Sequence, residues 1–176
     1  SGYGDHSRDL VMSLIEMNLF EINIIDQMWG HCPQNALPAD HPMRQFIVHR
    51  MEKQPDIWIQ VTVPNEFQPL GKYNIGITAG IETTLCSPQW LEGCNRMNKV
   101  IVPSEHSKYV FEKTNYDKKQ EGSDVVVEKL SCKTDIEVLF EGLDLKRYKK
   151  TNHIVKPIKE KIDSIKEDFC FLVCGH

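Results

Sequence analysis

The sequence predicts an α/β protein with a Rossmann-like, doubly wound parallel sheet and helices on both faces of that sheet. Between residues 57 and 113, short apolar runs rich in β-branched and aromatic residues alternate with helical patterns. Such alternation is typical of βαβ units, whose strands run parallel. The chain has 176 residues, of which 40% are hydrophobic, so it is long enough to bury a core. These observations favour one α/β domain with part of another.

The first third of the chain predicts a helix, a strand and a second, shorter helix. Apolar residues fall on one helical face between residues 6 and 18, and Asp5 is the expected N-cap. Residues 19–25 alternate in hydrophobicity as a strand does. After a polar loop that contains several prolines, we expect a short helix over residues 43–51, which Pro55 ends.

The central run predicts two strands, a helix, a third strand and another helix. Residues 57–63 form the clearest strand, and residues 73–79 form the next. The helix over residues 88–97 begins with a proline, which suits a first helical turn. Residues 99–102 then form a short apolar strand. A serine caps the helix that follows over residues 104–113.

The pattern weakens after residue 113. Residues 115–133 are polar and irregular apart from a short valine run, so we expect an excursion on the surface there. Residues 136–140 form another strand. After Gly142 the composition shifts to basic and polar residues, which indicates a boundary between residues 143 and 153.

The sequence at both ends predicts that the chain is a piece of a larger protein. The first domain, residues 1–145, lacks the strand that should precede its glycine-bearing start. Residues 146–176 contain a linker, a helix over residues 154–165 and a buried strand over residues 169–175. That strand is typical of the beginning of a second domain, so we expect truncation at both ends.

Charge and cysteine content exclude several classes of function. The formal net charge is −4, which argues against a broad affinity for nucleic acid. No apolar stretch approaches the ~20 residues that span a bilayer. The six cysteines include no C-x-x-C pair, and nothing nearby completes a metal site beside His31 and Cys32. We therefore expect a soluble, cytoplasmic protein with reduced thiols, no transmembrane segment and no bound metal.

The glycine-bearing start is the first candidate site. Gly2-x-Gly4 before a helix allows a close approach to backbone N–H groups, and the helix dipole favours an anion there. An ordinary tight turn would show the same pattern. Asp5 would compete with a phosphate for those N–H groups, a charge that His6 or Arg8 would offset.

Glu82 and Ser104 are candidates because each follows a predicted strand. In a doubly wound sheet that position faces the ligand crevice. The Glu82 carboxylate would accept hydrogen bonds from sugar hydroxyls or act as a base; a capping or solvent-exposed glutamate is the alternative. Ser104 is first of all an N-cap, and a second role at the crevice stays open.

The central run contains a set of motifs: residues 74–84, Pro88-x-Trp90, Cys94-Asn95 and residues 100–108. They resemble the N-terminal half of GT-B glycosyltransferases, most closely the retaining, family-4-like ("group 1") enzymes. The start of the chain is similar to that family's glycine loop, and Glu141 to Asp144 resemble the end of its N-terminal half.

The resemblance implies transfer of a sugar from a nucleotide-sugar donor to an acceptor, with no cofactor and no required metal. This chain would form the acceptor side of a cleft between two Rossmann-like domains. The acceptor would be a glycan, a lipid or a small molecule, and peripheral contact with a membrane stays open. The implied site residues are Glu82 as the catalytic group, Gly2, Tyr3, Gly4 and His6 at the donor phosphates, and Thr83 and Ser104 at the substrate.

The chain also departs from that family. Its first strand and almost all of the donor-binding domain are absent, so we expect the fragment alone to be inactive. Many relatives place a histidine after the strand that ends here in Ala79-Gly80, and this chain has none. The alternative is a catalytically inactive Rossmann-like module that binds or scaffolds.

Overall fold

The computed structural model describes most of the chain, and contacts among the described residues divide it into two units. One unit ends at Glu141 and the other begins at Gly142; the boundary expected from the sequence follows residue 145. The expected strand over residues 169–175 lies largely outside the described residues, as do His31 and Cys32. The described residues are 2–27, 35–119, 122, 124–142, 145, 148–151, 154–169 and 171.

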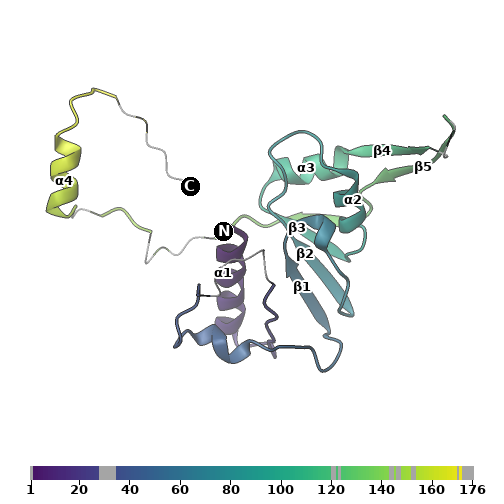
Figure 1. Ribbon diagram of the computed structural model, residues 1–176, viewed down its shortest axis with the longest axis horizontal. Helices are drawn as coiled ribbons and strands as arrows, with labels where there is room; N and C mark the ends of the chain where they lie inside the picture. The colour runs from purple at the N-terminus through teal and green to yellow at the C-terminus, as the bar shows by residue number, and fades with distance from the viewer. Residues whose placement is uncertain are drawn as a thin grey trace. The chain divides into compact units, whose positions relative to one another are not determined.

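A four-stranded parallel sheet organises the first unit (Figure 1). Its strands are β1 (Ile57–Val61), β2 (Tyr73–Ile77), β3 (Lys99–Val102) and β6 (Asp135–Val138), in the order β1-β2-β3-β6. Every pairing is parallel, which confirms the α/β class and the three central strands. Among the described strands the order runs in one direction, without the reversal that divides a doubly wound sheet. All four carboxyl ends therefore lie along one edge.

Three helical segments between the strands cover one face of the sheet. They are η2 (Pro64–Glu66), α2 (Pro88–Cys94) and α3 (Glu105–Lys113). Successive right-handed crossovers in one direction keep such segments on the same face. The proline at the first turn of α2 and the serine cap of α3 are both as predicted. The core between these helices and the sheet is made of Phe67, Cys86, Leu91, Cys94, Met97, Val100, Val102, Val110, Phe111, Leu130 and Ile136.

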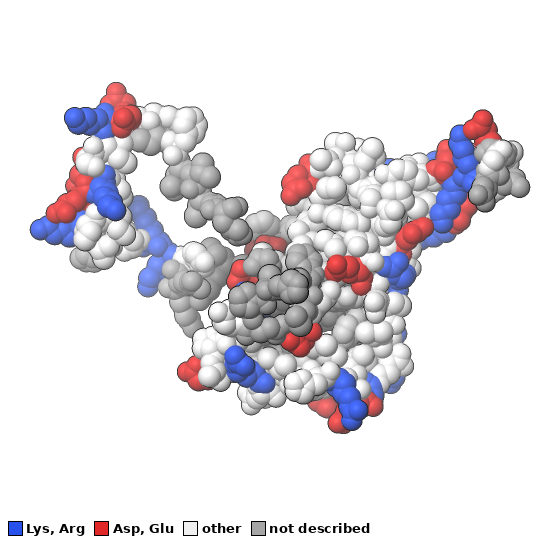
Figure 2. Space-filling model, in the orientation of Figure 1, with Lys and Arg blue, Asp and Glu red and all other residues white. Residues whose placement is uncertain are grey.

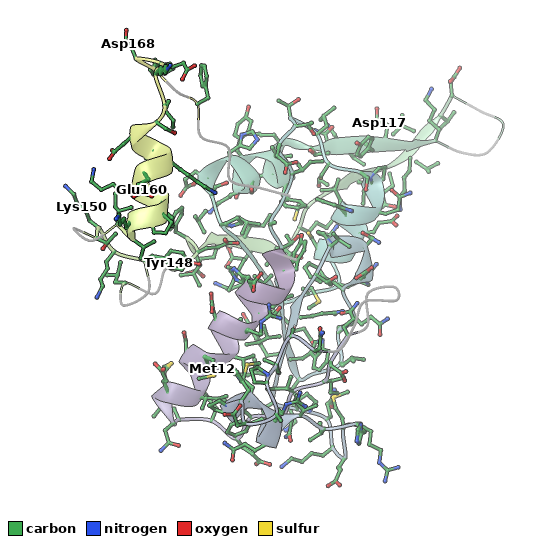
Figure 3. The ribbon with its side chains drawn as sticks, turned by 60° about the vertical axis from the view of Figure 1, so that its left-hand side comes forward. Met12, Asp117, Tyr148, Lys150, Glu160 and Asp168 are labelled. Carbon is green, nitrogen blue, oxygen red and sulfur yellow. The ribbon has the colours of Figure 1, made fainter. Side chains whose placement is uncertain are left out.

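The long helix α1 (Gly2–Met17) lies on the side of the sheet opposite α2 (Figure 1). None of its residues is fully buried, and Met12 on its outer turns is only half-buried (Figure 3). Asn18 ends the helix in the left-handed region, with φ 51°, a conformation that asparagine tolerates better than most residues. The α1 face of the sheet is therefore covered more loosely than the α2 face.

The segment between α1 and β1 differs from the expected strand and helix. Instead of a strand over residues 19–25, only Ile24 pairs, in a single parallel bridge with Ile47. Instead of a helix over residues 43–51, a short 3₁₀ helix, η1 (Pro42–Phe46), ends at the bridged Ile47. The alternating pattern was present, but no neighbouring strand continues the hydrogen-bonded ladder, so the strand does not form.

The polar stretch after α3 is also more regular than expected. Strands β4 (Asn115–Lys119) and β5 (Val126–Ser131) form an antiparallel hairpin, which corrects the expected irregular excursion over residues 115–133. Tyr116 lies opposite Leu130, which is buried, and Tyr116 donates a hydrogen bond to the Cys86 carbonyl at 2.6 Å. These contacts with the core order a segment whose own composition is too polar to predict a strand.

The second unit contains one described helix, α4 (Lys156–Asp163), inside the range expected for it. Pro157 lies in its first turn, a position that proline tolerates. Its apolar residues Ile158 and Ile162 are exposed, and Lys159 pairs with Asp163 at 2.7 Å. Figure 2 shows that acidic and basic side chains are mixed along this helix and along the β4–β5 hairpin. Neither surface has the single sign of charge that attracts a polyanion.

Replacement of Gly93 by alanine tests the tight packing of α2. A Cβ at Gly93 would overlap the Pro64 carbonyl in η2. We expect Gly93→Ala to lower the free energy of unfolding by about 2–3 kcal/mol, although alanine is the better helix former. Gly142→Ala is the control, because nothing lies within 4 Å of a Cβ there. Equal urea midpoints for both variants would contradict the packing described here.

Candidate functional site

A cleft of about 210 Å³ opens at the carboxyl edge of the sheet. The ends of all four strands contribute to it, and the first turn of α1 forms its other side. Ligands of open α/β sheets bind outside the carboxyl ends of the strands, so this is the candidate site. Its lining residues are Gly2, Tyr3, His6, Val61, Ile77, Thr78, Ala79, Ile101, Val102, Pro103, Leu139 and Glu141.

Tyr3 attaches α1 to the end of β2. Its phenol oxygen lies 3.0 Å from Thr78 Oγ1 and accepts a hydrogen bond of 3.2 Å from the Ala79 N–H. Thr78 is only 1% exposed, so its hydroxyl needs a partner inside the protein. The contact satisfies that hydroxyl and a backbone donor at the point where β2 leaves the sheet.

His6 and Glu141 form the charged part of the cleft. His6 Nδ1 lies 3.0 Å from Glu141 Oε1, and the two side chains are 22% and 53% exposed. A neutral histidine that donates from Nδ1 to a carboxylate presents Nε2 as an acceptor. The pair can therefore hold an imidazole oriented to take a proton from a hydroxyl group.

The glycine-bearing start is a helical turn and not a loop, which corrects the prediction. Helix α1 already includes Gly2, Tyr3 and Gly4. Asp5, the expected N-cap, lies inside the first turn, and Arg8 Nη2 pairs with its Oδ1 at 2.5 Å. The backbone continues the helix back through both glycines, because the Tyr3 side chain holds this turn against the sheet.

The structure separates the other predicted site residues from the cleft. Glu82 and Thr83 are exposed in the loop that follows Gly80 and line no part of the cleft. Gly80 has φ 82°, and a Cβ there would overlap Ser107 of α3, so the chain turns toward α3 at this glycine. That turn carries Glu82 out of the cleft. The Thr83 hydroxyl donates to the Leu85 carbonyl at 3.3 Å within the same loop.

Ser104 is the N-cap of α3, as predicted. Its Oγ accepts a hydrogen bond of 3.1 Å from the Ser107 N–H. It does not line the cleft, and neither does Gly4. Of the predicted site residues, the structure brings together Gly2, Tyr3 and His6.

Thr78 and Glu141 are the site residues that sequence reasoning missed. Each is a polar residue that follows a predicted or observed strand of apolar character. The rule that selected Glu82, a carboxylate just past a strand, applies equally to Glu141 after β6. Pairing with His6 distinguishes Glu141, and that pairing depends on the position of α1.

The amino edge of the sheet carries a different group of charges. Lys99, the first residue of β3, pairs with Glu137 at 2.6 Å and with Asp135 at 3.0 Å. Hydrogen bonds to Glu137 and then to Asp135 raise the pKa of Lys99. Lys99 and Asp135 are the first residues of β3 and β6, whose other ends meet the cleft, so this ion-pair cluster lies at the opposite end of the strands from the cleft.

The part of the chain that the structure describes holds neither a metal cluster nor a membrane span. No three histidine, cysteine, aspartate or glutamate side chains among the described residues come together as ligands of a metal ion. No described helix combines the length and the apolar character needed to cross a bilayer. Compared with known proteins, the chain matches no family model, no curated protein and no solved structure.

Removal of the Tyr3 hydroxyl tests the attachment of α1. Tyr3→Phe keeps the ring but leaves the Thr78 hydroxyl and the Ala79 N–H without this partner. We expect the free energy of unfolding in urea to fall by about 0.5–1.5 kcal/mol. Tyr109→Phe is the matched control, since Tyr109 is exposed on α3. The same small change in both variants would show that the Tyr3 contact contributes nothing to stability.

Proposed function

We propose that this chain forms the acceptor side of the cleft of a glycosyltransferase that uses a nucleotide-sugar donor. The observation that carries the proposal is the cleft itself. A hydrogen-bonded histidine–carboxylate pair and a tyrosine–threonine pair meet at the carboxyl edge of a parallel sheet. The resemblance of residues 74–108 to family-4-like glycosyltransferases supports the sugar as the transferred group. The donor nucleotide, the sugar and the stereochemical course are left unassigned.

The residues of the cleft suit a sugar acceptor. Ile77, Ile101 and Leu139 supply an apolar floor on which the C–H face of a sugar ring packs. His6 Nε2 accepts the proton of the attacking acceptor hydroxyl, and Glu141 orients the imidazole and stabilises its charged form. Tyr3 keeps α1, and with it His6, against the sheet. In this proposal Tyr3 is a positioning residue.

Glu82 is the competing choice for the catalytic carboxylate. It follows β2, which lies in the segment whose sequence resembles the glycosyltransferase family, yet Glu82 itself lies on the exposed loop beyond Gly80. Glu141 lies in the cleft and is bonded to His6. Replacement by glutamine should therefore weaken ligand binding at Glu141 and leave it unchanged at Glu82. The two variants form a matched pair for experiment.

Ligand binding to the full chain tests the proposal. Nucleotide-sugars and simple glycosides are screened by ligand-observed NMR, and each hit is titrated against Glu141→Gln and Glu82→Gln. Loss of a charge-assisted hydrogen bond should weaken binding of a glycoside about tenfold or more in Glu141→Gln. Glu82→Gln should bind as the parent chain does. Thermal unfolding of both variants shows whether each remains folded.

Two outcomes would overturn parts of this assignment. Weaker binding in Glu82→Gln but not in Glu141→Gln would return the site to the loop after Gly80. The absence of binding by any glycoside or nucleotide-sugar to the folded chain would remove the transferase proposal. That second result would leave the catalytically inactive scaffold as the better account.

A further inference from the structure

Two thiols meet on the face of the sheet opposite α1. Cys94 is the last residue of α2, and Cys132 directly follows β5. Cys132 packs against the core that contains Cys94, and Asn95, the residue after Cys94, is hydrogen-bonded to the residues on both sides of Cys132. Both are free thiols. Residues far apart in the sequence thus bring two oxidisable thiols close together.

The backbone around this pair is fixed by three further hydrogen bonds. The Thr134 hydroxyl donates to the Cys94 carbonyl at 2.7 Å. Asn95 Nδ2 donates to the Ser131 carbonyl at 2.8 Å, and the Lys133 N–H donates to Asn95 Oδ1 at 2.6 Å. The end of α2 and the turn after β5 therefore hold the two cysteines together on both sides.

The two thiols differ in access to solvent. Cys94 is fully buried, whereas Cys132 is partly exposed. Cys86, the third described cysteine, is buried beside Thr114, whose Oγ1 accepts a hydrogen bond of 3.3 Å from the Cys86 N–H. An oxidant from solution therefore reaches Cys132 first, and Cys94 is the buried thiol at the end of α2, against which the turn after Cys132 lies.

We propose that Cys94 and Cys132 form a reversible disulfide when a hydroperoxide oxidises the protein, so that the pair is a redox modification site. The site is independent of the cleft, because neither cysteine lines it. The lowered pKa of Cys132 agrees with its place as the thiol that reacts first. The hydrogen bond from Cys94 lowers the pKa of Cys132, and the same contact together with burial raises the pKa of Cys94.

The reaction with hydrogen peroxide balances in two steps. The Cys132 thiolate attacks one peroxide oxygen, an S–O bond forms, the O–O bond breaks, and the departing hydroxide takes a proton to become water. Cys94 then attacks the Cys132 sulfur of the sulfenic acid. The S–S bond forms, the S–O bond breaks, and the Cys94 proton leaves with the hydroxide as a second water. Two thiols lose two electrons, and the peroxide gains them.

Peptide mapping of the full chain tests the proposal directly. The chain is treated with hydrogen peroxide, blocked with an alkylating agent, and cut with trypsin and a glutamate-specific protease. Cleavage after Glu92 separates Cys94 from Cys86. We expect a linked pair of peptides, Gly93–Arg96 joined to Leu130–Lys133, which dithiothreitol separates. Linkage of Cys132 to any other cysteine, or oxidation of Cys132 without linkage, would overturn the proposal.

Variants and stability give a second measurement. Oxidation should raise the thermal midpoint of the parent chain by roughly 5–10 °C, because the bond constrains the unfolded state. Cys86→Ala is the matched control and should keep this shift, whereas Cys132→Ala should lose it. If Cys132→Ala does not fold, mapping of the parent chain still decides the proposal. A parent chain that is linked but not stabilised would contradict the close geometry inferred here.

The pH dependence of alkylation tests the order of reaction. The thiolate is the reactive form, so a lowered pKa makes Cys132 reactive at a lower pH than an ordinary thiol. We expect the rate at which iodoacetamide modifies Cys132 of the native chain to reach half its maximum at a lower pH than it does for free cysteine. Cys86 and Cys94 are buried and should react only on unfolding. Burial raises the pKa of Cys86, and the interaction with Cys132 followed by burial raises the pKa of Cys94. Faster modification of Cys94 than of Cys132 would reverse the assignment.

Discussion

Helices from both faces of the sheet contact Ala79, and the structure of the carboxyl edge depends on the hydrogen bonds that the Ala79 backbone makes with them. The Ala79 N–H donates to the Tyr3 phenol of α1, and its carbonyl accepts a hydrogen bond of 3.2 Å from the Ser107 hydroxyl of α3. A strand end that leaves a sheet loses ladder partners, and its backbone groups find others. Two helices on opposite faces supply them here. The cleft exists because α1 is held at this point and covers the face only loosely beyond it.

The central strands were predictable because their physical basis is local and strong. Strands β1, β2 and β3 are rich in β-branched and aromatic residues, which suit a parallel sheet covered by helices. Helix α3 was equally readable, because proline and serine before a helical pattern mark its start. In each case, side chains within a few residues of one another determine the outcome.

The β4–β5 hairpin and the segment after α1 were not predictable, because contacts distant in sequence decide them. Residues 115–119 are polar, and they become a strand through the buried Leu130 and the Cys86 carbonyl. Residues 19–25 have the better strand pattern, and they stay largely unpaired because only Ile47 meets them. A pattern of hydrophobicity shows what a segment can do, while the available partner determines what it does.

The candidate site shows the same division between local and distant information. The rule that polar residues after parallel strands gather at one edge selects both Glu82 and Glu141, and only Glu141 lines the cleft. A glycine after a strand signals a turn, but its direction depends on the contact with Ser107. Tyr3 and His6 were selected as parts of a phosphate loop, and the structure makes them the helical side of the cleft. The side chains of Tyr3 and His6 therefore indicated part of the site, whereas the glycine pattern beside them indicated a loop that does not form.

The two faces of the sheet also separate the cleft from the thiol pair. Helix α1 reaches the cleft through side-chain contacts of its first turn, whereas α2 is tightly packed against η2 and the core. A bond between Cys94 and Cys132 would join two segments that already touch through Asn95 and Thr134. It would therefore stabilise the α2 face without moving the sheet, so the contacts of Ala79 would stay the same. Oxidation should accordingly change the stability of the chain and leave ligand affinity at the cleft unchanged, which equal dissociation constants for the reduced and oxidised chain would show.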